Sequence, residues 1–384
     1  MLDGTPTSVI ERRRLLRQLP APIPAAGLLA YEHERELALA RSPECRANYA
    51  RYLKSRRREA VVDYLPIKLD IENVSRCNYR CTMCAVSDWH KGTRAEDLSL
   101  EAFRRLIDEQ TGLVEIKLQG LGEPVMQGDD YFAMIRYARS KHIWVRTTTN
   151  ASLLHLKNNC RDLIDTDVNE VQISVDGASK ASFETIRRGA NFERVCSNIR
   201  QINAYCKEKG VTRTKMWTVV QKANRHELTD LVALGADLGF TCQVFSLELT
   251  DWGLDRWRDL NGDASVAVEL DPDFLLGLVE RARDLGVRLE FWNATSKYSV
   301  TSRDSLCPWP FERAYLSSDR RVVPCCFVGN PDVAQIGAGA IDDGFSSVWF
   351  GEDFRNFRQA HLDGRIPNYC RGCYSDAPAN DPKD

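Results

Sequence analysis

Three cysteines stand close together in the segment Cys77-Asn-Tyr-Arg-Cys81-Thr-Met-Cys84. Thiolates are the ligands that soft metal centres prefer, and this spacing allows all three to reach one centre. A structural zinc site is closed by four ligands, and an ordinary [4Fe–4S] cluster also takes four cysteines. Three cysteines would leave one iron of such a cluster open, and an open iron can bind and reduce another molecule.

Such cysteines also have simpler interpretations. A C-x-x-C pair is often a zinc or redox motif, and single cysteines are often small buried residues. The longer C-x-x-x-C-x-x-C spacing is more specific, and it resembles the cluster motif of the radical S-adenosylmethionine (SAM) superfamily. The resemblance implies that Cys77, Cys81 and Cys84 hold a [4Fe–4S] cluster whose open iron chelates SAM. One electron would then cleave SAM to a 5′-deoxyadenosyl radical, which abstracts a carbon-bound hydrogen from the substrate.

Further segments resemble the same family in their order along the chain. Leu121-Gly122-Glu123-Pro124 resembles its G-G-E-P motif, Thr147-Thr148-Thr149-Asn150 its T-N-G segment, and Ile173-Ser174-Val175-Asp176-Gly177 its S-x-D-G motif. The resemblance implies that Gly122, Glu123 and Pro124 surround the ammonium of SAM, which needs hydrogen-bond acceptors. It also implies that Asn150 faces SAM or the substrate, and that Ser174 binds the ribose or the carboxylate of SAM.

Two more positions follow from the resemblance. Met83 stands where the family usually has an aromatic residue against the adenine, and a thioether can also cover a ring face. Arg187 and Arg188 lie in a segment that resembles the family's arginine–glycine stretch. We expect one of them, taken here as Arg188, to bind the SAM carboxylate with its forked guanidinium. A solvated pair of arginines on a helix is the alternative.

The C-terminal part of the chain has a second group of cysteines, at Cys307, Cys325-Cys326 and Cys370-Arg-Gly-Cys373. It resembles the SPASM/twitch extension of radical SAM enzymes, which holds an auxiliary [4Fe–4S] cluster. The resemblance implies one such cluster on Cys307, Cys325, Cys370 and Cys373, with Cys326 as the spare residue. Four ligands leave no open iron, so this cluster would relay electrons. A four-cysteine zinc ribbon is the alternative.

Short apolar runs alternate with amphipathic stretches from Ile67 onward, which predicts parallel strands joined by crossover helices. The predicted strands are Ile67–Ile71, Glu115–Gln119, Ile143–Thr148, Glu170–Val175, Lys215–Val220, Cys242–Leu247 and a shorter seventh, Arg288–Trp292. The predicted helices between them are Leu100–Glu109, Tyr131–Ser140, Arg194–Lys209, Arg225–Leu238 and Asp273–Leu285. This α/β pattern fits the partial (β/α)6 TIM barrel of radical SAM proteins. The first cysteine triplet follows the first strand, and barrel chemistry gathers at the C-terminal ends of strands.

We divide the chain into a helical N-terminal extension (residues 1–65), a radical SAM partial barrel (66–295) and an auxiliary cluster domain (296–384). Three stretches of the extension favour helices, namely Glu11–Gln18, Tyr31–Ala40 and Arg46–Ala60. The basic run at residues 51–58 is either a cradle for a phosphorylated substrate or a solvated helix face.

The composition excludes several classes of protein. The formal net charge is −2, so there is no basic footprint for nucleic acid. No signal peptide and no run long enough to span a membrane stands out. Thirteen cysteines in such a chain favour metal or redox chemistry in the cytoplasm.

The resemblance implies an enzyme that draws electrons from a donor such as flavodoxin or ferredoxin. We expect a small polar substrate, a sugar or an aminocyclitol of the kind found in antibiotic pathways, whose secondary alcohol is oxidised to a ketone with electron transfer to the auxiliary cluster. Epimerisation is an alternative and would use a cysteine as hydrogen donor, for which Cys242 and Cys326 are the candidates. The sequence is also compatible with a peptide-modifying enzyme and with a non-catalytic iron–sulfur or zinc scaffold.

Overall fold

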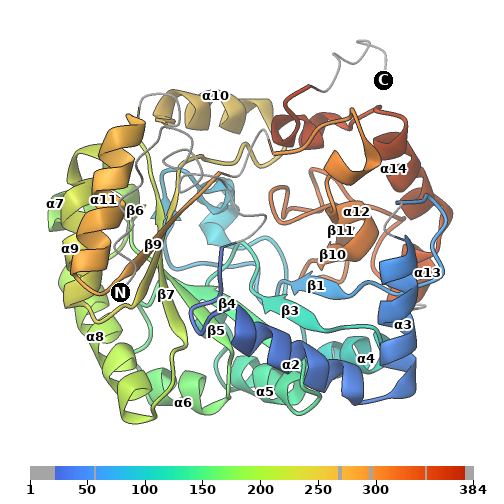
Figure 1. Cartoon of the computed structure of the whole chain (residues 1–384), viewed down its shortest axis with the longest axis horizontal. Coiled ribbons are helices and arrows are strands. Elements are labelled where there is room, and N and C mark those ends of the chain that lie inside the picture. Colours follow the sequence, from blue (N-terminus) through green and yellow to red (C-terminus); the bar gives the residue numbers. More distant parts are fainter. Residues whose placement is uncertain (1–21, 56–57, 267–269, 294–296, 342–343, 377–384) are drawn as a thin grey trace, which may run out of the picture.

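The computed structural model describes residues 22–55, 58–266, 270–293, 297–341 and 344–376. The predicted helix at Glu11–Gln18 and the end of the chain after residue 376 lie outside these ranges. A single nine-stranded sheet organises the molecule, with the strand order β11-β10-β1-β3-β4-β5-β7-β8-β9. It curves around a central space, and helices surround its outer face (Figure 1).

All seven predicted strands are confirmed, with ends that differ by at most one residue from the prediction. They are β1 (Lys68–Ile71), β3 (Glu115–Leu118), β4 (Trp144–Thr149), β5 (Glu170–Ser174), β7 (Thr214–Val219), β8 (Cys242–Ser246) and β9 (Arg288–Trp292). Every neighbouring pair among them is parallel. The α/β partial-barrel prediction is therefore correct.

Four short strands of the described chain were not predicted, two of them in the C-terminal part. The strands β10 (Arg313–Leu316) and β11 (Val322–Val323) come from the cysteine-rich C-terminal part, and β10 lies parallel to β1. The proposed auxiliary domain thus extends the barrel sheet beyond its first strand. Two residues elsewhere, β2 (Arg80–Cys81), pair with β6 (Arg187–Arg188) and tie the first cysteine loop to the arginine segment.

The predicted helices within the described ranges are present, most of them with shifted ends, and the largest shift is in Arg46–Ala60, where the helix ends at Lys54. The helices Asn159–Asp165, Lys180–Ile186 and Asp255–Ala264 were not predicted. The helices that cover the sheet or precede it are α2 (Leu28–Ala40), α3 (Pro43–Lys54), α4 (Leu100–Glu109), α5 (Asp129–Arg139), α6 (Asn159–Asp165), α7 (Lys180–Ile186), α8 (Phe192–Glu208), α9 (Leu228–Asp237), α10 (Asp255–Ala264) and α11 (Pro272–Asp284). The C-terminal part has α12 (Trp309–Glu312), α13 (Phe345–Trp349) and α14 (Glu352–Leu362). None of the described helices combines the length and the apolar composition that a membrane span requires.

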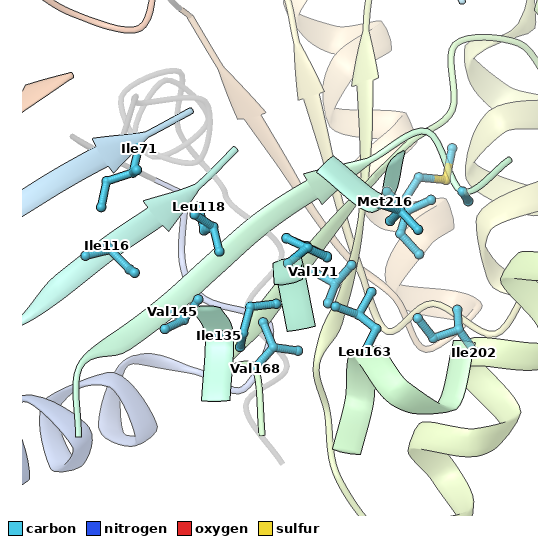
Figure 2. Close-up of a cluster of buried hydrophobic side chains, with 14 of the residues drawn as sticks. Ile71, Ile116, Leu118, Ile135, Val145, Leu163, Val168, Val171, Ile202 and Met216 are labelled. Atoms are coloured by element: carbon cyan, nitrogen blue, oxygen red, sulfur yellow. The ribbon is translucent and has the colours of Figure 1, made fainter. Parts of the chain in front are cut away.

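The strands alternate between apolar and polar residues, and the two kinds face opposite sides of the sheet. The apolar residues, among them Ile71, Ile116, Leu118, Val145 and Val171, are fully buried beneath the helices. Figure 2 shows them packed against residues of the covering helices, such as Ile135 and Leu163. This outer layer is the hydrophobic core of the barrel.

The inward side of the sheet is polar, unlike a barrel filled by branched apolar side chains. Glu115 is 6% exposed and forms ion pairs with Lys68 at 3.4 Å and Arg146 at 3.0 Å. The Tyr31 hydroxyl also donates to Glu115, over 2.8 Å. Burial acts to raise the pKa of Glu115, but the two cations outweigh it and lower that pKa below its usual range. The charges inside the barrel are therefore largely compensated.

A segment that precedes α2 closes the end of the barrel where the strands begin. The Ile23 amide donates to Glu290 over 2.9 Å, and its carbonyl accepts from Lys215 over 2.6 Å. The Ala25 amide donates to Glu170 over 2.9 Å. These partners lie at or near the N-terminal ends of β9, β7 and β5. The N-terminal extension thus forms the floor of the barrel, by contacts that its helical pattern did not predict.

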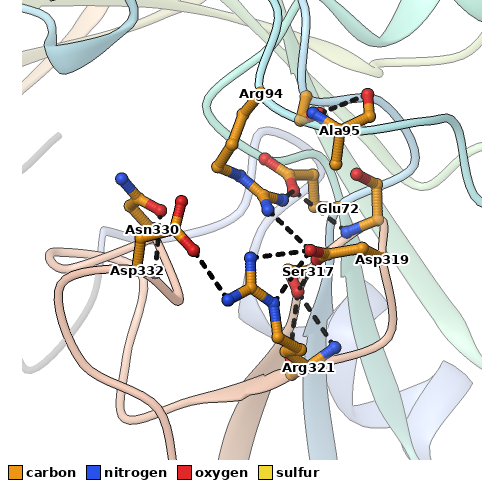
Figure 3. Close-up of polar contacts among 10 residues, drawn as sticks. Glu72, Arg94, Ala95, Ser317, Asp319, Arg321, Asn330 and Asp332 are labelled. Atoms are coloured by element: carbon orange, nitrogen blue, oxygen red, sulfur yellow. Dashed lines mark hydrogen bonds and ion pairs between the residues drawn. The ribbon is translucent and has the colours of Figure 1, made fainter. Parts of the chain in front are cut away.

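A buried ion network connects the loop after β1 with the turn after β10 (Figure 3). Glu72 is fully buried and accepts from Arg94 over 2.7 Å and from the Ser318 amide over 3.0 Å. Arg94 also pairs with Asp319 at 2.9 Å, and Asp319 pairs with Arg321 at 2.7 Å. Because these residues come from both halves of the chain, the network fixes the two cysteine-bearing regions relative to each other.

Replacing Glu72 by glutamine should lower the free energy of unfolding by about 3 kcal/mol, because it removes the more deeply buried of the two carboxylates that compensate Arg94. Urea denaturation followed by circular dichroism would measure the change. The matched control is Glu101→Gln, whose carboxylate pairs with Arg105 on the surface at 85% side-chain exposure. That variant should change the free energy by less than about 0.5 kcal/mol. Equal effects of the two substitutions would contradict a structural role for the network.

Candidate active site

A cavity of about 1310 Å³ occupies the barrel and opens among the loops that follow the strands. Nine of the residues expected at the site lie in its wall, namely Cys77, Cys81, Met83, Cys84, Gly122, Glu123, Asn150, Ser174 and Cys326. The other expected residues lie behind this wall or away from it. They are Pro124, Arg188, Cys242, Cys307, Cys325, Cys370 and Cys373.

The first three cysteines lie on the loop after β1. The Cys77 amide donates to the Gly92 carbonyl over 3.2 Å, and the Cys84 amide donates to the Cys81 carbonyl over 3.2 Å. Burial and then the neighbouring Cys81 raise the pKa of Cys84 to about 12. Burial and then Glu123 raise the pKa of Cys77. Three thiols crowded in this way keep their protons until a cationic centre binds them.

The loop after β8 supports this cysteine loop from outside. Trp252 donates its indole N–H to the Met83 carbonyl over 2.9 Å, and Trp257 of α10 donates to Asp88 over 2.8 Å. The Asn261 side chain also donates to the Met83 carbonyl, over 3.3 Å. The backbone of Met83 is therefore fixed, and its side chain lies in the cavity wall.

Glu123 is a buried carboxylate in the cavity wall. It accepts from the Thr149 hydroxyl over 2.6 Å and from the Asn150 amide over 2.8 Å. Burial raises its pKa to about 7, against those two hydrogen bonds. A Cβ on the preceding Gly122 would overlap the Val74 carbonyl oxygen, so only glycine fits there. A cation such as an ammonium would stabilise the carboxylate of Glu123.

The arginine segment requires a correction to the residue chosen from the sequence. Arg188 is exposed, whereas Arg187 is 7% exposed and lies in the cavity wall. Successive residues of a strand point to opposite sides, so only one of the two can face inward. Arg187 pairs with Asp176 at 2.6 Å, and Asp176 also accepts from the Val219 amide over 2.8 Å. Of the two arginines, Arg187 and not Arg188 is therefore the one that lies in the cavity wall.

Pro124 also differs from its expected position. It begins the short 3₁₀ helix Pro124–Gln127 and is buried behind the loop. Its carbonyl accepts from the Asn73 side chain over 3.1 Å. Pro124 therefore shapes the loop that presents Gly122 and Glu123.

The four C-terminal cysteines come from three separate segments. Cys307 precedes α12, Cys325 follows β11, and Cys370 and Cys373 lie in the 3₁₀ helix Asn368–Cys373. The Cys307 amide donates to the Tyr374 hydroxyl over 2.9 Å. Burial, and then nearby cysteines, raises the pKa values of Cys325, Cys370 and Cys373. These thiols are close enough to interact strongly.

The two spare cysteines lie in different surroundings. Cys326 lies in the cavity wall, where burial and then Asp70 raise its pKa to about 11 against the opposite effect of Lys117. Cys242 begins β8 at the closed end of the barrel and is fully buried. Its sulfur accepts from Arg288 over 3.2 Å. Of the two, only Cys326 lies in the wall of the cavity that contains the first cysteine triplet.

Both groups of cysteines fit iron–sulfur clusters. Among the described residues, no three cysteine, histidine or carboxylate side chains converge tightly enough for a single metal ion. The irons of a [4Fe–4S] cluster occupy separate corners, so its cysteines surround a shared space. Buried thiols with raised pKa values suit a cationic iron centre, which holds them as thiolates. The backbone at Gly122 lies too close to the Val74 carbonyl for a side chain, and the carboxylate of the adjacent Glu123 is buried. Both features fit the ammonium end of SAM.

Several residues of the cavity wall were missed at the sequence level. They are the inward polar and aromatic residues of the strands, including Asp70, Lys117, Arg146, Trp292 and Tyr315. The sequence did contain a signal for these inward residues, because polar and apolar residues alternate along Ile67–Glu72 and Glu115–Gln119. Such alternation in a parallel sheet covered by helices indicates a polar interior.

Comparison with known proteins agrees with this site. Residues 73–234 match the model of the radical SAM superfamily, and residues 307–374 match that of the SPASM iron–sulfur cluster-binding domain. Mycofactocin maturase MftC of Mycolicibacterium smegmatis is 29% identical over 203 residues, which are 52% of this chain and 49% of the relative. GTP 3′,8-cyclase 2 of Pseudomonas aeruginosa is 29% identical over 168 residues, 43% of this chain and 49% of that protein. The chain thus spans about half the length of these relatives.

Solved structures share the fold at low sequence identity. SuiB of Streptococcus suis superposes with a TM-score of 0.60 and 14% identity, over 85% of this chain and 76% of SuiB. The anSMEcpe protein with bound AdoMet gives a TM-score of 0.55 and 17% identity, over 80% of this chain and 84% of that protein. The motifs, the fold and the matches agree. The chain carries a radical SAM domain over residues 73–234 and a SPASM iron–sulfur cluster-binding domain over residues 307–374, whose cofactors are SAM and [4Fe–4S] clusters.

Proposed function

We propose that this enzyme oxidises a secondary alcohol of a small polar substrate, such as a sugar or an aminocyclitol, and passes an electron to the auxiliary cluster. The observation that carries the proposal is the cavity itself, whose wall is polar and whose floor is closed by residues before α2. Such a space suits a compact molecule with several hydrogen-bonding groups.

Each group of the proposed site residues has a separate role. Cys77, Cys81 and Cys84 would hold the catalytic cluster, and Gly122 with Glu123 would hold the ammonium of SAM. When bound, SAM and the open iron supply a carbon-centred radical that can remove a hydrogen atom from a C–H bond. The surrounding protein excludes water and keeps the substrate carbon within reach of that radical.

The second group of cysteines supports oxidation of the substrate radical over the return of a hydrogen atom to that radical. Once the C–H hydrogen has gone, ketone formation requires the loss of the hydroxyl proton and of one electron. Cys307, Cys325, Cys370 and Cys373 would hold the cluster that accepts the electron, and water or a cavity carboxylate would accept the proton. A flavodoxin or ferredoxin would supply the electron that starts each turnover.

Epimerisation is the second candidate, and the position of Cys326 favours it. Its thiol faces the same cavity as the first cysteine triplet and stays protonated at neutral pH. A protonated thiol can return a hydrogen atom to a substrate radical from the face opposite the abstraction. Cys242, which lies at the closed end of the barrel, is not retained for this role.

Peptide modification is the third candidate. Mycofactocin maturase is among the relatives, and a SuiB structure has been solved with its precursor peptide. Before β1, however, the described residues form helices, with no strand pair that a peptide could extend. The closed floor also favours a compact substrate over an extended chain.

The protein should bind about eight irons per chain when it is reconstituted with iron and sulfide without oxygen, because three plus four cysteines hold two [4Fe–4S] clusters. Iron and acid-labile sulfide analysis, with zinc measured in parallel, would test this. About four irons with one zinc would mean that the C-terminal cysteines form a zinc ribbon.

Replacing Cys77, Cys81 and Cys84 together by alanine should abolish the formation of 5′-deoxyadenosine from SAM and dithionite, with at least a hundredfold loss. The auxiliary cluster should keep its absorption and electron paramagnetic resonance spectra, which separates loss of the site from loss of the fold. As a control, Cys45→Ala in helix α3 changes a buried cysteine outside both groups and should leave cleavage intact. Cleavage that survives the triple substitution would refute the assignment.

Incubation with a panel of sugars and aminocyclitols in deuterium oxide should yield a product two mass units lighter than its substrate, with one SAM consumed per product. Mass spectrometry would distinguish the candidate reactions. A product of unchanged formula with one solvent deuterium at an inverted carbon would instead establish epimerisation, and Cys326→Ala should then abolish it. Turnover of peptides alone would overturn the small-substrate proposal.

A further inference from the structure

One row of side chains crosses the cavity at a single level of the sheet. Asp70 of β1 is in register with Tyr315 of β10 on one side and with Lys117 of β3 on the other, and Lys117 is in register with Arg146 of β4. All four line the cavity. They are thus available to a molecule that enters the barrel.

Most charges around this row are paired. The wall here carries four cations, Lys68, Lys117, Arg146 and Arg313, and four carboxylates, Asp70, Glu115, Glu170 and Glu312. Glu170 pairs with Lys215 at 3.0 Å. Glu115 pairs with Lys68 and Arg146, while Arg313 pairs with Glu312 at 3.1 Å and lies 4.0 Å from Asp70. Of the four cations, only Lys117 has no ion pair within the described residues.

Lys117 forms no ion pair or hydrogen bond with any residue in the described ranges. Lys117 is half-buried in the cavity wall, and burial lowers its pKa. The hydroxyl of Tyr315 is a buried donor without a hydrogen-bond partner, on a residue only 1% exposed. A buried donor without a partner is costly, and a ligand that accepts from it removes that cost.

We propose that Lys117, assisted by the Tyr315 hydroxyl, binds an anionic oxygen group of the substrate, most simply a carboxylate. The inference rests on the proposed function for the idea of a small substrate inside the barrel. It narrows that substrate to an acid, such as a sugar acid or an amino acid derivative. A phosphoryl group presents the same oxyanion chemistry, and the experiment distinguishes the two.

Cys326 allows the subsite to be tested without turnover, because it lines the same cavity as Asp70 and Lys117 and interacts electrostatically with both. The full chain, with both clusters reconstituted and SAM added, is treated with an equimolar mixture of iodoacetate and iodoacetamide. Mass spectrometry of the Cys326 peptide gives the ratio of the anionic to the neutral label. Any change in thiol reactivity affects both reagents alike, so the ratio reports only the attraction of the anion.

Lys117→Gln should lower this ratio about tenfold, since an ammonium a few ångströms from a carboxylate in a protein interior is worth at least that preference. Lys117→Arg should keep the ratio within about twofold, and Tyr315→Phe should lower it less than Lys117→Gln. The matched control is Lys207→Gln, which removes the same charge from an exposed position on α8. An unchanged ratio in Lys117→Gln, with both clusters intact, would overturn the proposal.

Competing anions identify the group that is bound. At constant ionic strength set with chloride, acetate should slow the labelling of Cys326 more than inorganic phosphate does. Stronger protection by phosphate would assign the subsite to a phosphoryl group, and protection by neither anion would overturn it.

Should Cys326 resist both reagents, equilibrium dialysis with labelled acetate and phosphate gives the same comparison, and equal binding by the wild type and Lys117→Gln refutes the subsite. None of these readouts requires hydrogen abstraction, so failure of the proposed reaction would leave this test intact.

Discussion

The structure depends on a barrel whose inward side is polar. A buried charge is costly unless it is paired, and Glu115 illustrates how most charges of the barrel are compensated, with two cations and the Tyr31 hydroxyl around it. Because charged side chains cannot fill space as a close-packed apolar core does, a cavity remains between the strands. The hydrophobic stabilisation comes instead from the layer between the outer face of the sheet and the helices (Figure 2).

The same sheet determines where the two groups of cysteines lie. The first triplet follows β1, and β10, which carries the turn before Cys325, is the direct parallel neighbour of β1. The buried carboxylate of Glu72 then joins the loops after these two strands through Arg94 and the Ser318 amide. Two groups of cysteines that are far apart in the sequence are thus held by adjacent strands.

Long periodic segments and ligand spacings were readable from the sequence, because each depends on local patterns. All seven barrel strands and the cysteine motifs followed from them. The strands β10 and β11 were missed since they are four and two residues long and are stabilised by pairing with β1 and with each other. The choice between Arg187 and Arg188 depends on the pairing of β6 with β2, which no local pattern specifies. The contacts of Ile23 and Ala25 with the barrel floor join residues that are more than a hundred positions apart.

The closed floor and the open loops together constrain how the enzyme can work. Because the residues before α2 cover the beginning of the strands, a substrate must enter from the side on which the cysteine loops lie. A bound substrate would then lie between the polar row of the strands and the loop that carries Cys77, Cys81 and Cys84. Its polar groups would face Asp70 and Lys117, and its reactive carbon would point toward the SAM site. Under the proposed function, the polar interior would therefore also set the direction in which a substrate presents its C–H bonds.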